Sequence, residues 1–200
     1  MIACRLAAHD IACRRGDRVL FHGVSFALEA GAALHLTGPN GVGKSSLIRI
    51  LAGLSRPLAG RIEREGGIAL ADERPALDLH LPLARALGFW LRFDRAETPA
   101  LDRAVAVLAL EDLLDVPVRY LSTGQRKRAV LARTLLADAP LWLLDEPLNG
   151  LDTASAAAVE QLVADHCGRG GIAVIASHQP FAYSALARLE LGKHARAEAA

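Results

Sequence analysis

The chain has 200 residues, of which 52% are hydrophobic and 22% are charged, and this length and composition predict one compact globular domain. The formal net charge is only +1 and acidic and basic residues are interleaved, so no broad cationic face and no nucleic acid partner are expected. The three cysteines, Cys4, Cys13 and Cys167, form no C-x-x-C pair, which argues against a disulfide framework and a zinc site. The N-terminus lacks the features of a leader, and no run of about 18 apolar residues occurs, so we expect a chain that is neither exported nor membrane-spanning.

Strand patterns dominate the beginning of the chain. Over the first thirty or so residues, short apolar runs alternate with polar breaks, which predicts a small antiparallel sheet closed by a turn at Gly31. The sequence next predicts a buried strand at 32–37, a helix at 44–54 and a second strand at 68–71.

The rest of the chain alternates helices and strands. An Ala- and Leu-rich helical pattern covers about 79–114, and a further helix is predicted from about Gly124 to Ala137. The run "LWLLD" predicts a strand that ends at Asp145, and a helix at 152–166 and a strand at 171–177 follow. This alternation favours parallel strand pairing and an α/β core with both faces covered. The Ala-rich tail at 194–200 is predicted to be frayed.

A phosphate-binding pattern lies between the predicted strand at 32–37 and the helix after it. Residues 38–45 fit G-x-x-x-x-G-K-[ST] in the strand-to-helix context that this pattern requires. Glycines let backbone N–H groups face phosphate oxygens, Lys44 neutralises the β and γ phosphates, and the Ser45 hydroxyl can bind Mg²⁺. The residues predicted to bind the nucleotide are Gly38, Pro39, Asn40, Gly41, Val42, Gly43, Lys44, Ser45 and Ser46. This loop alone leaves kinases, GTPases, recombinases and transporter motors open.

Two acidic residues stand at the end of the apolar strand at 141–145. Asp145 lies where a carboxylate can hold the water shell of a metal ion beside the phosphate loop. Glu146 follows directly, and hydrolysis needs a proton acceptor in line with the γ-phosphate. We therefore expect Glu146 to polarise the attacking water; a solvated acidic turn is the alternative.

The stretch "LSTGQ" at 121–125 narrows the class of protein. It resembles the signature motif of ABC-type ATPases, and the order of phosphate loop, signature, "LLDEP", "NGLD" and "SHQ" is similar to that family's order over nearly the whole chain. A serine and a glycine N–H at a helix N-terminus make a second phosphate cradle, which has no phosphate of its own in this chain. The resemblance implies a head-to-tail homodimer in which each ATP contacts the other chain's Ser122, Thr123, Gly124 and Gln125.

The same resemblance implies further roles. Asp152 would communicate across the dimer interface, and His178 would contact the γ-phosphate of ATP, with Mg²⁺ as the metal cofactor. For His178, a purely structural role is the alternative.

Three positions depart from the family pattern. Thr123 replaces the commonest residue, glycine, and would be strained if that position needed a positive φ; we expect it to be tolerated. Glu73 stands where the coupling loop usually carries glutamine, although a carboxylate can still approach Mg²⁺. Where an aromatic residue usually stacks on adenine, only Arg14 and Arg15 are present, and either could stack its guanidinium or form a solvated face.

A single cassette without an added domain resembles the ATP-binding subunit of a multi-chain membrane transporter, most closely that of the haem exporters of bacterial cytochrome c maturation. The implied architecture is an ABC-type P-loop NTPase domain over 1–200, with an N-terminal antiparallel β subdomain and a helical insert at about 79–136. The implied location is the cytoplasmic face of the bacterial inner membrane, on integral membrane transporter subunits. An exporter ATPase of the drug or lipoprotein kind, or a soluble ABC clamp acting on ribosome or nucleic acid, is the alternative.

In this family a short helix of the membrane subunit enters a groove beside the coupling loop, which maps here onto 72–93. Phe89 and Trp90 in this segment either pack the core of the helical insert or remain available to the partner.

Overall fold

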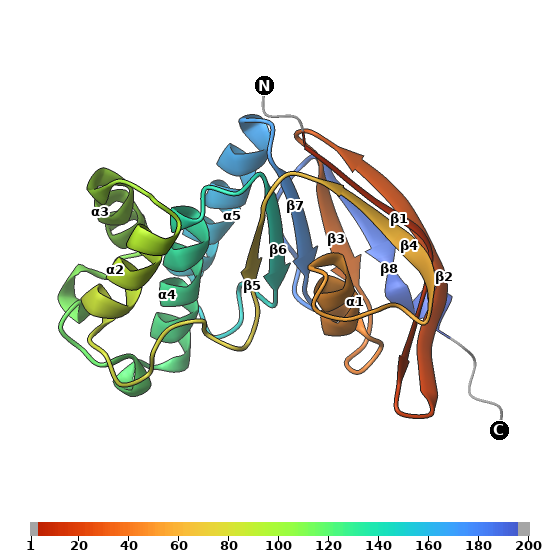
Figure 1. The fold of residues 1–200 in the computed structure, drawn as a ribbon, viewed down its shortest axis with the longest axis horizontal. Helices are drawn as coiled ribbons and strands as arrows, with labels where there is room; N and C mark the ends of the chain where they lie inside the picture. Colours follow the sequence, from red (N-terminus) through yellow and green to blue (C-terminus); the bar gives the residue numbers. More distant parts are fainter. Residues whose placement is uncertain (1–3, 196–200) are drawn as a thin grey trace.

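The computed structural model describes residues 4–195, so residues 1–3 and 196–200, and with them most of the tail predicted to be frayed, lie outside the described part. Two sheets and a group of helices make up the molecule, with the antiparallel sheet at one end and helices α2, α3 and α4 at the other (Figure 1). Within the described residues, no helix combines the length and apolar character needed to cross a membrane.

The antiparallel sheet has three strands. Its middle strand is β1 (Arg5–Arg15), which pairs with β2 (Arg18–Glu29) on one side and β4 (Ala59–Glu65) on the other. The predicted turn after β2 is present, since Gly31 has a φ of +87°, a conformation that glycine adopts without a Cβ clash.

The central sheet has five strands in the order β5-β6-β7-β3-β8, and every pair in it is parallel. The carboxyl ends of all its strands therefore lie along one edge, where the loops that follow them meet. The strands are β3 (Ala33–Thr37), β5 (Ile68–Ala71), β6 (Leu141–Asp145), β7 (Ile172–Ala176) and β8 (Leu186–Glu190).

Helices cover both faces of this sheet or pack beside it. Helix α1 follows β3, α5 lies between β6 and β7 in sequence, and α2, α3 and α4 form the helical group that the sequence places at about 79–136. The α-helices are α1 (Lys44–Leu51), α2 (Leu83–Phe93), α3 (Thr98–Val107), α4 (Thr123–Leu136) and α5 (Thr153–Gly168). Three short 3₁₀ helices are η1 (Glu111–Leu113), η2 (Val118–Tyr120) and η3 (Leu191–His194).

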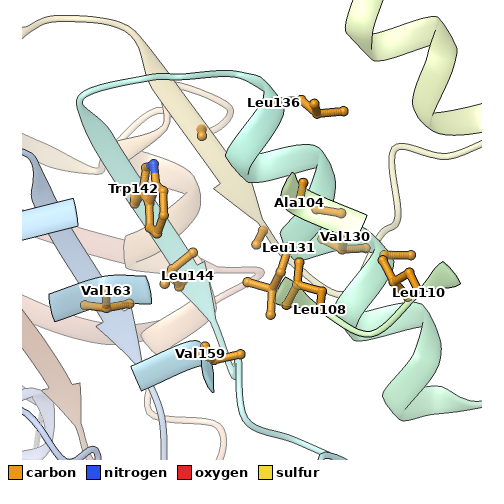
Figure 2. Close-up of a cluster of buried hydrophobic side chains, with 14 of the residues drawn as sticks. Ala104, Leu108, Leu110, Val130, Leu131, Leu136, Trp142, Leu144, Val159 and Val163 are labelled. Atoms are coloured by element: carbon orange, nitrogen blue, oxygen red, sulfur yellow. The ribbon is translucent and has the colours of Figure 1, made fainter. Parts of the chain in front are cut away.

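Two apolar clusters pack against the two faces of the parallel sheet. One joins α1 and the antiparallel sheet to residues such as Leu34 and Val174. The other joins α3, α4, α5 and β6, so the helical group and the sheet share one buried core (Figure 2). Burial of this apolar surface is the main stabilising contribution to the fold. The thiols of three cysteines are free and buried: Cys4, Cys13 and Cys167.

Two strands are absent from the sequence prediction. In β4 the sequence AGRIERE is mostly exposed and lacks the apolar alternation of a half-buried strand. In β8 the sequence LARLE shows a similar exposed pattern. Both are edge strands, so tertiary pairing with β1 and β3 decides their conformation.

A buried histidine packs at the amino ends of the parallel strands, away from the carboxyl ends. The ring of His166 in α5 stacks on Trp142 of β6, with centroids 4.0 Å apart. Its Nε2 lies 3.1 Å from the carbonyl oxygen of Pro140 and 3.3 Å from that of Ile172, which identifies Nε2 as the protonated nitrogen. Burial lowers the pKa of His166, against the raising effect of these two carbonyl groups.

The lowered pKa predicts a pH-dependent stability. The unfolded imidazole takes up a proton near pH 6.5, whereas the folded one does so only at lower pH, so stability is full above about pH 6.5 and is lost as the pH falls. We expect His166→Gln to reduce this dependence, by at most about 1.4 kcal/mol per pH unit, in urea unfolding between pH 5 and 7.5. The exposed His22 provides the matched control, His22→Gln. A wild-type slope in His166→Gln would refute the role of His166.

Candidate functional site

The phosphate loop connects β3 to α1 and needs glycine at three places. Gly38, Gly41 and Gly43 have φ values of +142°, +80° and +109°, which side chains with a Cβ rarely adopt. At Gly43 a Cβ would also lie 2.8 Å from a ring carbon of Phe21 in β2. The antiparallel sheet therefore presses against the loop, and only glycine fits there.

Lys44 begins α1 and extends over the loop. Its side chain is largely buried, and its Nζ donates to the carbonyl oxygens of Gly38 at 2.8 Å and Pro39 at 3.3 Å. The N-terminus of α1 has no side-chain cap, so its first N–H groups and the helix dipole face the same space as the ammonium group. Together these groups form an anion site suited to phosphate oxygens.

The carboxylate of Asp145 lies at the end of β6. Only 3% of this residue is exposed, and its Oδ1 has no hydrogen-bond partner within residues 4–195. Burial raises the pKa of Asp145, and Glu146 adds to this rise, while the Ser45 hydroxyl and Lys127 lower it. A buried, unpartnered carboxylate oxygen beside a serine hydroxyl offers the hard oxygen ligands that Mg²⁺ prefers.

Glu146 and His178 are brought together by neighbouring strands. The backbone N–H of Glu146 donates to the carbonyl of Ala176 at 2.8 Å, and this joins the ends of β6 and β7. The Nδ1 of His178 lies 2.9 Å from Oε2 of Glu146. Glu146 has a φ of +47°, a strained conformation for a non-glycine residue and one that is typical of functional sites.

Lys44, Ser45, Glu146 and His178 line one pocket of about 390 Å³ at the carboxyl ends of the parallel strands, and Asp145 lines an adjoining pocket that shares Ser45, Ser46 and Glu73 with it. Of the residues that the sequence associates with nucleotide and metal, most line this pocket, including Glu73 from the coupling loop. Arg15 lines it as well, beside Leu20. The full lining is Arg15, Leu20, Asn40, Gly41, Gly43, Lys44, Ser45, Ser46, Glu73, Glu146, Asn149 and His178.

The signature residues lie outside this pocket. Ser122 is the N-cap of α4, where its hydroxyl accepts from the N–H of Gln125 at 3.2 Å, and the Gln125 side chain accepts from the Ser122 N–H at 2.8 Å. This capping box fixes the start of the helix. Thr123 is the first residue of α4 and has no positive φ, so the strain considered for this position does not arise.

Gly124 fits closely against the turn that follows the acidic strand end. A Cβ at this position would lie 2.4 Å from the carbonyl oxygen of Gly150. Two residues further on, Asp152 caps α5 by accepting from the N–H of Ser155 at 2.8 Å, and the hydrogen bonds from the backbone and side chain of Ser155 lower the pKa of Asp152. The signature and the Asp152 turn therefore form one packed unit.

The sequence prediction did not include three residues at this site. Asn149 and Leu20 line the pocket. Lys127, one turn into α4, donates from Nζ to the carbonyl oxygen of Asp145 at 3.2 Å; burial lowers its pKa, whereas Asp145 and Glu73 raise it. The feature of the sequence that points to Lys127 is the basic run "QRKR", which places a cation about one helical turn after the signature residues.

Comparison with known proteins decides the family. A family model described as ABC transporter matches residues 21–149. The chain belongs to this family. The Cytochrome c biogenesis ATP-binding export protein CcmA of Novosphingobium aromaticivorans is 63% identical over 182 residues, which cover 91% of this chain and 93% of that protein. The protein of the same name from Sphingopyxis alaskensis is 52% identical over 187 residues, which cover 94% and 96%.

A solved structure of the ATP-binding subunit of an ABC transporter has a TM-score of 0.77 and 23% identity, and covers 86% of this chain and 79% of that one, so the fold is shared. The predicted fold class, an α/β cassette with an antiparallel and a parallel sheet, is confirmed. Membership of the family makes this chain an ATP-binding, ATP-hydrolysing subunit that works with membrane partner subunits.

The contact at Gly124 predicts a specific loss of stability. Gly124→Ala would force its methyl group into the Gly150 carbonyl, so we expect a loss of about 1 to 3 kcal/mol in the free energy of unfolding, measured by urea denaturation. Gly168→Ala is the matched control, because Gly168 is also helical and a Cβ there meets nothing within 4 Å. The control should be neutral or more stable by up to about 1 kcal/mol. Equal effects of the two substitutions would contradict the close packing at Gly124.

Proposed function

We propose that this chain is the ATP-hydrolysing subunit of a haem export complex for cytochrome c maturation. The observation that carries the proposal is the high identity, 63% and 52% over nine-tenths of both chains, to proteins named for ATP-binding export in cytochrome c biogenesis. The 200 residues act as a single ATPase domain, and the buried cluster shared by the helical group and the sheet supports this.

The nucleotide binds at the phosphate loop. The positive φ values of its glycines and the uncapped N-terminus of α1 support this assignment, because they direct backbone N–H groups at the same space. Lys44 exchanges its two backbone carbonyl partners for phosphate oxygens when ATP is present. The residues assigned to nucleotide binding are Gly38, Pro39, Asn40, Gly41, Val42, Gly43, Lys44, Ser45 and Ser46.

Ser45 and Asp145 would hold Mg²⁺, with Glu73 close enough to take part. The unpartnered, buried Oδ1 of Asp145 supports this assignment, since the oxygen lacks the partner that its burial requires. When bound, Mg²⁺ neutralises charge on the phosphate oxygens. The Lys127 ammonium fixes the end of β6 by holding the Asp145 carbonyl oxygen.

Glu146 accepts the proton of the attacking water, and His178 orients it. The 2.9 Å contact between the two side chains supports this division of roles, because the imidazole holds Oε2 in place at the pocket wall. His178 also reaches the same pocket as Lys44, so it can contact the γ-phosphate.

The second half of each ATP site comes from another copy of the chain. Ser122, Thr123, Gly124 and Gln125 stand at a helix N-terminus but do not line the pocket of their own chain. An anion cradle outside its own site is explained by a two-fold homodimer, in which the same patch serves both copies. Asp152 communicates across that interface, and its packing unit with the signature supports this role.

Arg15 is the adenine platform in place of the usual aromatic residue. Of the two candidate arginines, Arg15 lines the pocket that contains Lys44 and His178, whereas Arg14 lines only the adjoining pocket that contains Asp145. Its planar guanidinium can stack on the base, and Leu20 lies on the same pocket wall.

The membrane subunits dock beside the coupling loop. On α2, Phe89 and Phe93 are 51% and 67% exposed, so these rings do not pack the core of the helical group. Trp90 between them stacks under the guanidinium of Arg133, with the cation 4.1 Å from the ring centroid. Trp90 Nε1 also donates to the carbonyl oxygen of Ala76 in the coupling loop, and this exposed aromatic surface next to the loop supports docking on integral membrane subunits at the cytoplasmic face of the inner membrane.

The assignment of Glu146 predicts the behaviour of a single variant. Glu146→Gln should bind ATP with normal affinity, lose at least about 100-fold in the rate of hydrolysis, and accumulate as an ATP-dependent homodimer, because the amide cannot accept the proton. Phosphate release and light scattering with and without ATP measure these outcomes. Lys44→Ala should instead weaken nucleotide binding itself. Near-normal hydrolysis by Glu146→Gln would remove the residue from this role.

Deletion of the gene tests the biological role. The deletion strain should lose covalent c-type cytochromes and keep b-type haem proteins, as seen by haem staining of gels and by difference spectra. The wild-type chain should restore c-type cytochromes, and Glu146→Gln should not. Normal c-type cytochromes in the deletion strain would rule out a role in haem export and favour the alternative, an exporter with another cargo.

A further inference from the structure

A second buried histidine lies directly before the phosphate loop. His35 is in β3, three residues before Gly38, and only 2% of it is exposed. Leu34 and Leu36 belong to the cluster on the α1 face of the sheet, whereas Ala33 belongs to the cluster on the α5 face. Side chains alternate along a strand, so His35 faces the α5 side.

The segment that carries His178 crosses the sheet on this same face. Strand β3 lies between β7 and β8, so the connection from β7 to β8, residues 177–185, must pass over β3. Phe181 of this connection is buried in the cluster with α5, and the N–H of Ala182 donates to Oε1 of Glu160 in α5 at 2.7 Å. His35 therefore lies under the connection that places His178 beside Glu146.

The connection is tied to the phosphate-loop strand next to His35. The N–H of Ser177 donates to the carbonyl oxygen of Leu36 at 3.3 Å. The Ser177 hydroxyl accepts from the N–H of Gln179 at 2.9 Å, and the Gln179 amide donates to Oδ1 of Asn149 at 3.3 Å. One chain of hydrogen bonds thus joins β3, the segment around His178 and the turn after Glu146.

His35 itself is not satisfied. Within the described residues, neither Nδ1 nor Nε2 has a hydrogen-bond partner, which costs free energy for a buried polar ring. The strand register places Ile175 of β7 and Arg188 of β8 on either side of it. Burial and Arg188 lower the pKa of His35, while the backbone of Ser177, which lies near the ring but outside hydrogen-bond geometry in this structure, raises it.

The remaining charged neighbours have smaller effects: Glu146 raises the pKa of His35 and Lys44 lowers it. The lowered pKa keeps the ring neutral near pH 7, so one ring nitrogen donates and the other accepts.

We infer that His35 is a positioning residue for ATP hydrolysis: its ring gains a hydrogen bond to the backbone of the 177–185 connection when the site closes on nucleotide, and so fixes His178 against Glu146. The inference rests on the proposed ATPase function. A buried ring without a partner costs free energy, so a placement of the connection that supplies this bond is favoured over the one in this structure.

The test compares two substitutions in the full chain assembled with its membrane subunits. His35→Leu keeps the volume but removes both polar atoms, so kcat for ATP should fall about tenfold, equivalent to about 1.4 kcal/mol in the barrier, with KM for ATP within about twofold. His35→Gln retains a donor and an acceptor and should keep kcat within about threefold of wild type. His166→Leu is the matched control, because this buried histidine lies near the opposite edge of the sheet. It should lower the unfolding temperature and leave kcat unchanged.

Wild-type kcat in His35→Leu would overturn the inference, as would an equal loss of kcat in His166→Leu, since that would indicate general destabilisation. A second measurement tests the inference without this substitution, in case the His35→Leu chain does not fold. In ¹⁵N spectra of the Glu146→Gln chain, the His35 ring N–H should become protected from exchange when ATP and Mg²⁺ are added. A ring proton that stays unprotected would refute the inference. If the wild-type complex hydrolyses ATP and the Glu146→Gln complex hydrolyses it at the same rate, the proposed function is refuted instead. Failure of the inference and failure of the proposed function are therefore distinguishable.

Discussion

The site depends on the parallel pairing of the central sheet. Because β3, β6 and β7 run in the same direction and are hydrogen-bonded neighbours, the phosphate loop, the acidic pair and the histidine that follow them emerge at one edge. The pairing of Asp145 with Ala176 extends this register to the last residues of the strands. Backbone hydrogen bonds, rather than contacts between the functional side chains, therefore bring together groups that are far apart in sequence.

The second constraint is electrostatic. The carboxylate of Asp145 is buried, and Glu146, Glu73 and Lys127 are the charged groups that act on it. A cluster of this kind favours a bound cation, because the cation offsets the repulsion that the neighbouring carboxylates exert on the buried Asp145. The same arrangement gives Asp145 and Glu146 different surroundings: Asp145 is buried beside Ser45, and Glu146 faces the open pocket and His178. These different surroundings support the different roles proposed for the two adjacent carboxylates.

Sequence reasoning succeeded where function imposes residue types at fixed local spacing. The glycines of the phosphate loop, the strand ending at Asp145 and the helix that begins at the signature are all local patterns, and each has its predicted place in the structure. It failed where conformation is imposed from a distance. The edge strands β4 and β8 have weak patterns of their own and are strands because β1 and β3 offer hydrogen-bond partners.

The sequence by itself determined the family and the fold class, because these depend on motifs and on apolar periodicity, and it predicted the residues of the candidate site. The tertiary structure alone decided which of Arg14 and Arg15 reaches the pocket, that Lys127 holds the end of β6, and that Phe89 is exposed. It also decided that His35 is a buried ring without a partner, under the connection that carries His178. The physical reason is the same in each case: burial and hydrogen bonding depend on which segments cross or pair in space, and neither is encoded in the spacing of residues along one strand or helix.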